Sequence, residues 1–240
     1  MDITKITKPA RKVLKLKKCG AVIVAAGSAS RMGGIDKVMA SLGGEPMIAR
    51  TVRAFQECDA VSEIVIVTRE DLILPITELT NGCEKVKAVV AGGKSRQESV
   101  GKGLNALSKD VKLAAIHDGA RPLITWQLID WVIRAANTYG AAAPAIPVKD
   151  TIKTVEGGLV VNTPDRSKLN AVQTPQVFDI DMLKGALLKA YQDGAEVTDD
   201  CSAVERLGMT VKTVEGDERN LKVTTPLDLK LAEMLMEENA

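Results

Sequence analysis

Short apolar runs alternate with amphipathic helix patterns along most of this chain, and this alternation constrains the fold more than any other feature. The predicted strands are residues 20–26, 63–68, 86–91, 112–117, 141–148 and 210–214. Their side chains are almost continuously apolar, which is the pattern of parallel strands buried on both faces. Strands of this kind, separated by helices, predict an α/β fold with a Rossmann-like, doubly wound and mostly parallel sheet.

The predicted helices between these strands begin at recognisable signals. Pro46, Ser95, Thr125 and Thr225 each precede an apolar pattern of helical period, and Ser95 with Glu98 has the spacing of a capping box. The side chains expected to face the core are Ile48, Val52 and Phe55 in the first helix, Val100, Leu104 and Leu107 in the second, Leu128, Val132 and Ala136 in the third, and Leu227, Leu231, Met234 and Leu235 in the last.

Residues 151–163 interrupt the alternation and predict a β-hairpin that turns at Gly157 and Gly158. We expect this hairpin to project as an arm, at about residues 149–172, from a single domain formed by residues 19–240. An arm of this kind is either a surface decoration or a contact with a second subunit, and composition does not choose between them. Pro144 and Pro147 just before it predict an edge or irregular strand rather than a central one.

Basic residues are concentrated at the start of the chain. Residues 1–18 hold seven Lys or Arg and one acid, which leaves 25 basic against 30 acidic residues in the remainder. The body of the protein therefore lacks the broad basic surface of a duplex-nucleic-acid binder. For the first 18 residues we favour a flexible, solvated leader, with a transit-peptide remnant and a nucleic-acid-binding arm as alternatives.

Cysteine and histidine are too sparse for several kinds of site. The four cysteines form no close pair, and His117 is the only histidine. This composition disfavours a zinc site and, unless His117 is the base, a Ser-His-Asp mechanism. Scattered, reduced cysteines favour a cytoplasmic or similarly reducing compartment. No apolar stretch approaches the roughly 20 residues that cross a bilayer.

The loop after the first predicted strand, residues 25–37, is small and glycine-containing. Its small residues let backbone N–H groups approach an anion, and Arg31 and Lys37 are placed to face a polyphosphate. A plain turn with two solvated bases explains the local pattern equally well. The loop is not a dinucleotide fingerprint, because Ala29 and Met32 stand where glycines are required.

Three further loops belong to the same edge of the predicted sheet, where ligands bind in doubly wound folds. Gly92 and Gly93 lead into a helix on which Arg96 and Ser99 face either ligand or solvent. Asp118 ends a strand, where it meets a metal or ligand hydroxyl or merely starts a turn. Lys222 precedes the final helix. Taken together, the four loops predict a pocket for a polyphosphate.

These loops carry motifs in an order and spacing that resemble the 2-C-methyl-D-erythritol 4-phosphate cytidylyltransferase family of the non-mevalonate isoprenoid pathway. The likeness runs from about residue 20 to the C-terminus. It rests on Ala-Ala-Gly-x-x-x-Arg-Met-Gly, Gly-Gly-x-x-Arg-x-x-Ser-Val, His-Asp-Gly-Ala-Arg-Pro, Pro-Val-Lys-Asp-Thr, Thr-Pro-Gln and Asn-x-Lys-Val-Thr. The first motif alone would indicate only a nucleotidyltransferase of the sugar-nucleotide type.

The resemblance implies a nucleotidyltransferase that joins CTP to 2-C-methyl-D-erythritol 4-phosphate with Mg²⁺ and releases pyrophosphate, as a homodimer interlocked by the arm. It implies catalytic roles for Arg31, Lys37, Arg166 and Lys222, with Thr151 and Arg166 serving the partner's site. It places the nucleotide against Ala25, Ala26, Gly27, Gly93, Ser99, Asp118 and Gly119, and the polyol phosphate against Arg121, Thr151, Thr174 and Thr198. Mg²⁺ would be held mainly by the CTP phosphates, with Asp118 as a candidate ligand.

Three residues depart from the family pattern, namely Ala29, Asp36 and Lys94. They raise the question of an altered substrate preference, so a related ribitol-5-phosphate cytidylyltransferase stays as the alternative. A non-catalytic nucleotide-binding protein is a further alternative, against which the retention of Arg31, Lys37, Asp118 and Lys222 argues. We expect a cytoplasmic protein, or a plastid one if the basic leader is a transit remnant, without nucleic-acid or membrane partners.

Overall fold

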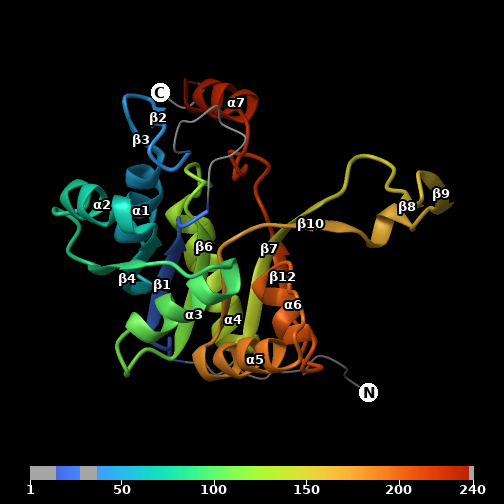
Figure 1. The fold of residues 1–240 in the computed structure, drawn as a ribbon, viewed down its shortest axis with the longest axis horizontal. Helices are drawn as coiled ribbons and strands as arrows, with labels where there is room; N and C mark the ends of the chain where they lie inside the picture. Colours follow the sequence, from blue (N-terminus) through green and yellow to red (C-terminus); the bar gives the residue numbers. More distant parts are fainter. Residues whose placement is uncertain (1–14, 28–36, 238–240) are drawn as a thin grey trace, which may run out of the picture.

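The computed structural model describes residues 15–27 and 37–237, and its centre is an eight-stranded mixed sheet (Figure 1). The strand order is β10-β7-β11-β6-β1-β4-β5, and β12 also pairs with β7. The strands are β1 (Cys19–Val24), β4 (Val61–Thr68), β5 (Val86–Ala91), β6 (Leu113–Asp118), β7 (Ala141–Pro147), β10 (Asn170–Val172), β11 (Gln176–Asp179) and β12 (Lys212–Glu215). The predicted α/β class with a mostly parallel sheet is confirmed.

The parallel half of the sheet explains the apolar runs of the sequence. β1 lies between β4 and β6 and runs parallel to both, and β4 pairs in parallel with β5. Apart from half-buried Val24, every residue of β1 and β6 is buried, because helices cover both faces. The six predicted strands all form, within two residues of their expected ends.

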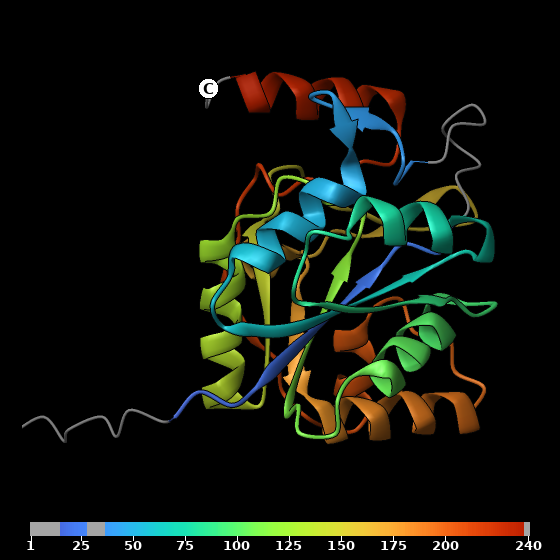
Figure 2. The ribbon, with the colours of Figure 1, turned by 90° about the vertical axis from the view of Figure 1, so that its left-hand side faces the viewer.

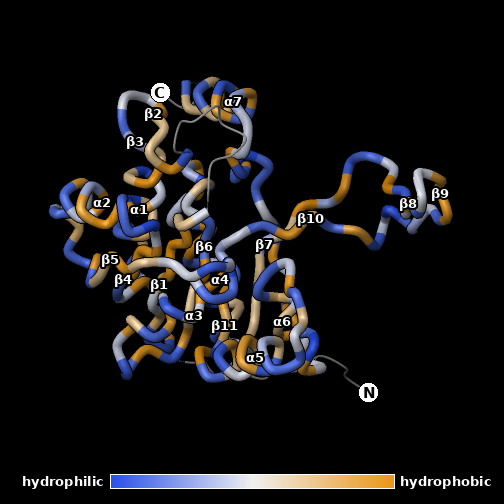
Figure 3. The backbone as a smooth tube through the Cα atoms, viewed as in Figure 1, coloured by the Kyte–Doolittle hydropathy of each residue, from blue (hydrophilic) through white to orange (hydrophobic). Residues whose placement is uncertain are grey.

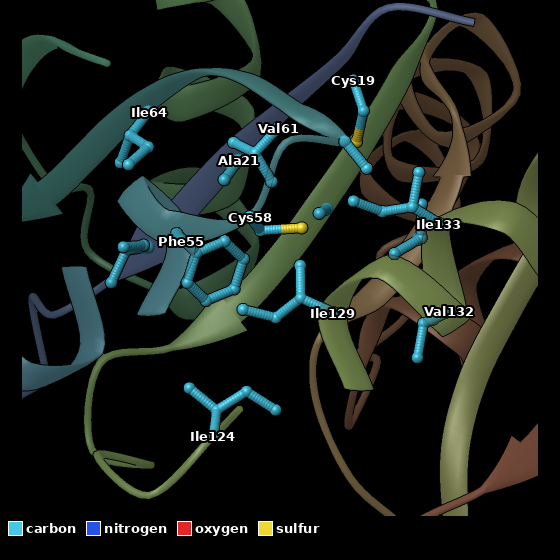
Figure 4. Packing of buried hydrophobic residues seen from close by; sticks show 14 of the residues in the cluster. Cys19, Ala21, Phe55, Cys58, Val61, Ile64, Ile124, Ile129, Val132 and Ile133 are labelled. Carbon is cyan, nitrogen blue, oxygen red and sulfur yellow. The ribbon is translucent and has the colours of Figure 1, made fainter. Parts of the chain in front are cut away.

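Helices cover the sheet in two layers (Figure 2). One face carries α1 (Met47–Glu57), α2 (Ile73–Leu79) and α4 (Trp126–Tyr139). The opposite face carries α3 (Arg96–Ala106), α5 (Ile180–Gln192) and α6 (Asp200–Glu205). Phe55 of α1 lies among Ile129 of α4 and Ile64 of β4 on the first face (Figure 4). The core residues predicted for these helices are confirmed as buried.

Helix starts agree with the capping signals of the sequence. Ser95 accepts a hydrogen bond from the N–H of Glu98, and Thr125 accepts one from that of Leu128. Pro46 immediately precedes α1. The second hydrogen bond of the predicted capping box differs from the expected one. The Glu98 carboxylate accepts from the N–H of Lys94 instead of the N–H of Ser95.

The last helix, α7 (Pro226–Glu237), buries a different face from the predicted one. Leu227, Leu231 and Met234 are exposed, whereas Ala232 is buried and packs with Met236 against the small hairpin of β2 (Ser41–Leu42) and β3 (Glu45–Pro46). The prediction of Leu227, Leu231 and Met234 as core residues is therefore wrong. The helix carries two apolar stripes, and its packing position at the end of the sheet selects the other stripe (Figure 1).

β7 is not an edge strand, because it pairs with β10, β11 and β12. It is the irregular strand that its prolines gave as the alternative, because β11 pairs with its first residues and β10 with its last, with an interruption between them. The carbonyl of Pro144 accepts a hydrogen bond from Gln173, in the short link between β10 and β11. The side of Pro144 that lacks an N–H thus faces a break in the pairing, where no donor is needed.

The predicted hairpin forms at the far end of a projecting arm (Figure 1). β8 (Thr154–Glu156) pairs with β9 (Leu159–Asn162) across Gly157 and Gly158, both of which have positive φ. A short 3₁₀ turn, η2 (Arg166–Lys168), follows, and a second one, η1 (Glu70–Leu72), precedes α2. In Figure 3 the β9 strand is coloured as hydrophobic, and its residues Leu159, Val160 and Val161 are exposed. None of the described helices is long and apolar enough to cross a membrane.

Candidate functional site

A cavity of about 460 Å³ lies beyond the carboxyl ends of β1, β5 and β6. This is the edge at which ligands bind in doubly wound sheets. Segments from four parts of the chain meet there, as the four-loop pattern predicts. The lining residues are Val24, Ala25, Ala26, Gly27, Lys37, Val38, Gly93, Lys94, Ser95, Arg96, Ser99, Asp118, Ala120 and Lys222.

The first loop reaches the cavity directly from β1. The N–H of Ala25 donates to the carbonyl of Val67 at 2.7 Å, so the chain stays joined to the sheet just before the loop begins. Lys37, the first described residue after this loop, also lines the cavity. Arg31, Ala29 and Asp36 lie outside the described residues.

The second loop is shaped by Ser99, which is only 2% exposed. Its hydroxyl accepts from the N–H of Gly93 at 3.0 Å and donates to the carbonyl of Ser95 at 2.9 Å. At Gly92 a Cβ atom would lie 2.5 Å from the Cβ of Ala26, so only glycine lets the two loops approach this closely. The amino end of α3 consequently faces the cavity, and its dipole favours an anion there.

Asp118 is the electrostatic centre of the site. Its carboxylate lies 2.8 Å from Nζ of Lys222, 3.7 Å from Nε of Arg96 and 3.9 Å from Nε of Arg121. Burial alone would raise the pKa of Asp118, but Lys222, Arg96 and Arg121 together lower it to about 2. The group is therefore ionised throughout the physiological range and holds three cations beside the cavity.

Arg96 is a site residue whose direction the sequence leaves open. Its guanidinium donates to the buried carboxylate of Asp200 at 2.7 Å and also faces Asp118. Burial lowers the pKa of Arg96, but Asp200 and Asp118 more than offset this effect, and Arg96 stays charged. Gln176 fixes Asp200 in turn by accepting from the N–H groups of Asp200 and Cys201. Sequence reasoning missed Asp200, because only the fold brings it to Arg96.

Most residues expected in the site do converge there. Ala25, Ala26, Gly27, Lys37, Gly93, Ser99, Asp118 and Lys222 line the cavity. Three others lie against this lining: Gly119 donates its N–H to the carbonyl of Val24, Arg121 faces Asp118, and the hydroxyl of Thr174 accepts from the N–H of Asp118.

Three expected site residues lie elsewhere. Thr151 and Arg166 are exposed on the arm, where Nη1 of Arg166 donates to the carbonyl of Lys149 at 2.6 Å. Thr198 is exposed in the segment between α5 and α6. None of the three lines the cavity of its own chain.

The described residues do not form a metal site by themselves. Within residues 15–27 and 37–237 there is no cluster of three or more His, Cys, Asp or Glu side chains suited to a metal ion. Asp118 faces three cations, which compete with a metal for its oxygens. Among the described residues, the cations around Asp118 therefore favour an anionic ligand in the cavity.

Comparison with known proteins agrees with this geometry. The family model described as 2-C-methyl-D-erythritol 4-phosphate cytidylyltransferase matches residues 19–238. A protein of that name from Symbiobacterium thermophilum is 48% identical over 221 residues, covering 91% of this chain and 93% of that protein. One from Caldanaerobacter subterraneus is 43% identical over 228 residues, covering 90% and 97%.

Solved structures agree as well. The crystal structure of 4-diphosphocytidyl-2C-methyl-D-erythritol synthase from Anaerococcus prevotii superposes with a TM-score of 0.84 at 30% identity, covering 92% of this chain and 96% of that one. The enzyme from Thermus thermophilus superposes with a TM-score of 0.72 at 33% identity, covering 90% and 98%. This chain belongs to the 2-C-methyl-D-erythritol 4-phosphate cytidylyltransferase family.

Proposed function

We propose that this chain transfers the cytidylyl group of CTP to 2-C-methyl-D-erythritol 4-phosphate, releasing pyrophosphate and forming 4-diphosphocytidyl-2-C-methyl-D-erythritol. The observation that carries the proposal is a cavity that Lys37 lines and in which Lys222 and Arg96 face a buried, ionised Asp118, in a chain of this family. The family match favours methylerythritol phosphate over ribitol 5-phosphate as the acceptor.

The reaction needs charge stabilisation more than it needs a base. An oxygen of the acceptor phosphate forms a bond to the α-phosphorus of CTP, while the bond to the bridging oxygen breaks and pyrophosphate leaves with the electron pair. A phosphate monoester is mostly ionised at neutral pH, because its second pKa is about 6. The chain's single histidine is buried and hydrogen-bonded, which is consistent with a reaction that requires no imidazole base.

The charged residues have distinct roles in this proposal. Lys37, with Arg31, stabilises the negative charge that develops around the α-phosphate. Lys222 orients the acceptor phosphate: one of its N–H groups is engaged by Asp118, and the side chain is 42% exposed. The loops around Gly27 and Gly93 hold the nucleotide, and Arg121, Thr174 and Thr198 support the acceptor side.

Mg²⁺ enters this proposal as part of the substrate. The triphosphate supplies the hard oxygen ligands that Mg²⁺ prefers, and the ion normally keeps several waters. The cation-rich surroundings of Asp118 support this assignment, since a carboxylate already facing three cations is a poor additional ligand. No side chain of the described cavity is required to hold the metal.

We propose a homodimer in which the arm of one subunit completes the site of the other. Thr151 and Arg166 do not line their own cavity, and they belong to an arm whose apolar residues Val155, Leu159 and Val160 are more than half exposed. Exposed apolar surface of this kind commonly marks a protein interface.

A cytoplasmic or similarly reducing location fits the chemistry of the cysteines, and a plastid location stays open with the basic leader. All four cysteines are free, and Cys19, Cys58 and Cys201 are buried. Proteins of oxidising compartments more often pair their cysteines.

Pyrophosphate release from CTP, measured with each acceptor side by side, tests the proposed function. We expect release with 2-C-methyl-D-erythritol 4-phosphate and much less with ribitol 5-phosphate or without an acceptor. Preference for ribitol 5-phosphate would show that Ala29, Asp36 or Lys94 has redirected the site. CTP binding without turnover of either acceptor would support a non-catalytic role.

A further inference from the structure

His117 is fully buried at the carboxyl end of β6, directly before Asp118. Its ring packs on Phe55, with the ring centroids 4.9 Å apart. Both ring nitrogens have polar neighbours: Nδ1 lies 3.0 Å from Oγ1 of Thr174, and Nε2 lies 3.3 Å from the carbonyl oxygen of Arg121. His117 therefore contacts two segments of the site in addition to packing on Phe55.

These neighbours determine which nitrogen carries the proton. A carbonyl oxygen only accepts, so Nε2–H donates to Arg121, and Nδ1 accepts from the hydroxyl of Thr174. The oxygen of that hydroxyl is then available to accept from the N–H of Asp118, at 3.1 Å. Burial is the main cause that lowers the pKa of His117, to about 3, so the ring is neutral at physiological pH.

The hydrogen bonds of His117 belong to a closed hydrogen-bond network of four residues. Nη1 of Arg121 donates to the carbonyl of Asn220 at 2.6 Å, and Nδ2 of Asn220 donates to the carbonyl of Thr174 at 2.9 Å. Thr174 donates to His117, and His117 donates to Arg121, which completes the circle. We call this set of four residues, His117, Arg121, Thr174 and Asn220, the His117 network.

The His117 network joins the three segments that position the charged groups of the cavity. His117 precedes Asp118, whose backbone N–H is held by Thr174. Asn220 lies two residues before Lys222, whose ammonium pairs with Asp118 at 2.8 Å. Val223, the next residue, donates its N–H to the carbonyl of Ala120 at 2.8 Å. A shift in any one segment therefore changes the distance between Asp118 and Lys222.

We propose that His117 is a positioning residue. As a neutral hydrogen-bond donor and acceptor, its side chain holds the segments that carry Asp118 and Lys222 in place relative to each other. It never exchanges a proton with the substrate. The inference rests on the proposed function, because it assigns Asp118 and Lys222 to the site of cytidylyl transfer. It gives the chain's only histidine a role through its neighbours rather than as a base. Misplacing a charged group by about 1 Å can cost on the order of 100-fold in rate.

Isotope labelling tests the protonation directly, because histidine occurs once in the sequence. In protein labelled with ¹⁵N-histidine, we expect one ring in the neutral Nε2–H tautomer, unchanged from pH 5.5 to 8, with or without CTP. A ring that titrates within this range, or the Nδ1–H tautomer, would overturn the proposal. This result does not depend on enzymatic turnover, so it separates the inference from the proposed function.

Kinetics of two variants test the positioning role. His117→Phe keeps a ring against Phe55 but removes both hydrogen bonds, and Thr174→Val removes the hydroxyl with little change of shape. We expect kcat to fall about 10- to 100-fold in His117→Phe and less in Thr174→Val, with smaller changes in the KM for CTP. His117→Gln, which retains an amide donor and acceptor, should recover part of the loss.

Thr80→Val is the matched control. Thr80 is buried, its hydroxyl donates to the carbonyl of Ile76 at 2.7 Å, and it lies at the end of α2 away from the cavity. We expect this variant to lower Tm while leaving kcat unchanged. If folded His117→Phe or Thr174→Val loses only as much activity as Thr80→Val, His117 merely stabilises the core and the proposal fails. A wild-type protein without activity would instead contradict the proposed function.

Discussion

Lys37 is the described residue whose removal should affect the chemical step most directly. In Lys37→Ala we expect kcat to fall roughly 100- to 1,000-fold, because one preorganised contact to the developing charge contributes about 2.7–4 kcal/mol in comparable sites. Lys189→Ala is the control, because Lys189 is a surface lysine of α5 whose ammonium group pairs with Asp193, the residue just after that helix. Pyrophosphate release under saturating CTP measures both variants. Near-normal turnover in Lys37→Ala would remove this residue from the catalytic assignment.

Individual site residues differ in how far the sequence could place them. Lys37, Asp118 and Lys222 could be predicted, because each belongs to a loop at the carboxyl edge of the sheet. The direction of Arg96 could not be predicted, since its partner Asp200 lies 104 residues away in the chain. The His117 network could not be predicted from the sequence either, because three distant segments supply its members.

Helix α3 must pack closely on the sheet to bring Arg96 and Ser99 to the cavity, and Gly103 makes this approach possible. A Cβ atom at Gly103 would lie 2.3 Å from Cγ1 of Val22 and 2.9 Å from Cγ2 of Val67. In Gly103→Ala we expect a loss of about 1–3 kcal/mol in the free energy of unfolding, the usual cost of overpacking a core.

Gly101 in the same helix provides the control for this prediction. A Cβ atom there has no neighbour within 4 Å. Gly101→Ala should therefore stabilise the protein by about 0.4–1 kcal/mol, because alanine restricts the unfolded chain without strain in the helix. Urea unfolding of the two variants measures the difference. Equal effects of both substitutions would show that α3 does not lie as close to β1 and β4 as described.

Elements were predictable where the hydrophobic period was unambiguous. The parallel strands and the core faces of α1, α3 and α4 follow from their patterns. In α7, two apolar stripes compete, and only the tertiary contact with β2 and β3 selects the one that contains Ala232. β10 and β11 were missed, because each has only three or four residues and Thr174-Pro175 separates them.

For the whole molecule, the proposed exchange of arms predicts complementation between two inactive variants. We expect Arg166→Ala and Lys37→Ala each to be nearly inactive alone. In randomly mixed dimers, about a quarter of all sites would contain neither substitution if Arg166 serves the partner's cavity. Activity after mixing and subunit exchange measures this recovery. No recovery, despite exchange verified by mass spectrometry, would place Arg166 in the site of its own chain.

The molecular account as a whole rests on transfer of an intact cytidylyl group, and the position of a radioactive label tests that transfer most directly. With CTP labelled at the α-phosphate and 2-C-methyl-D-erythritol 4-phosphate as acceptor, the label should appear in 4-diphosphocytidyl-2-C-methyl-D-erythritol. Label at the γ-phosphate should appear only in pyrophosphate. Appearance of the α-label in CMP, or its retention in CTP while the acceptor is present, would contradict the account.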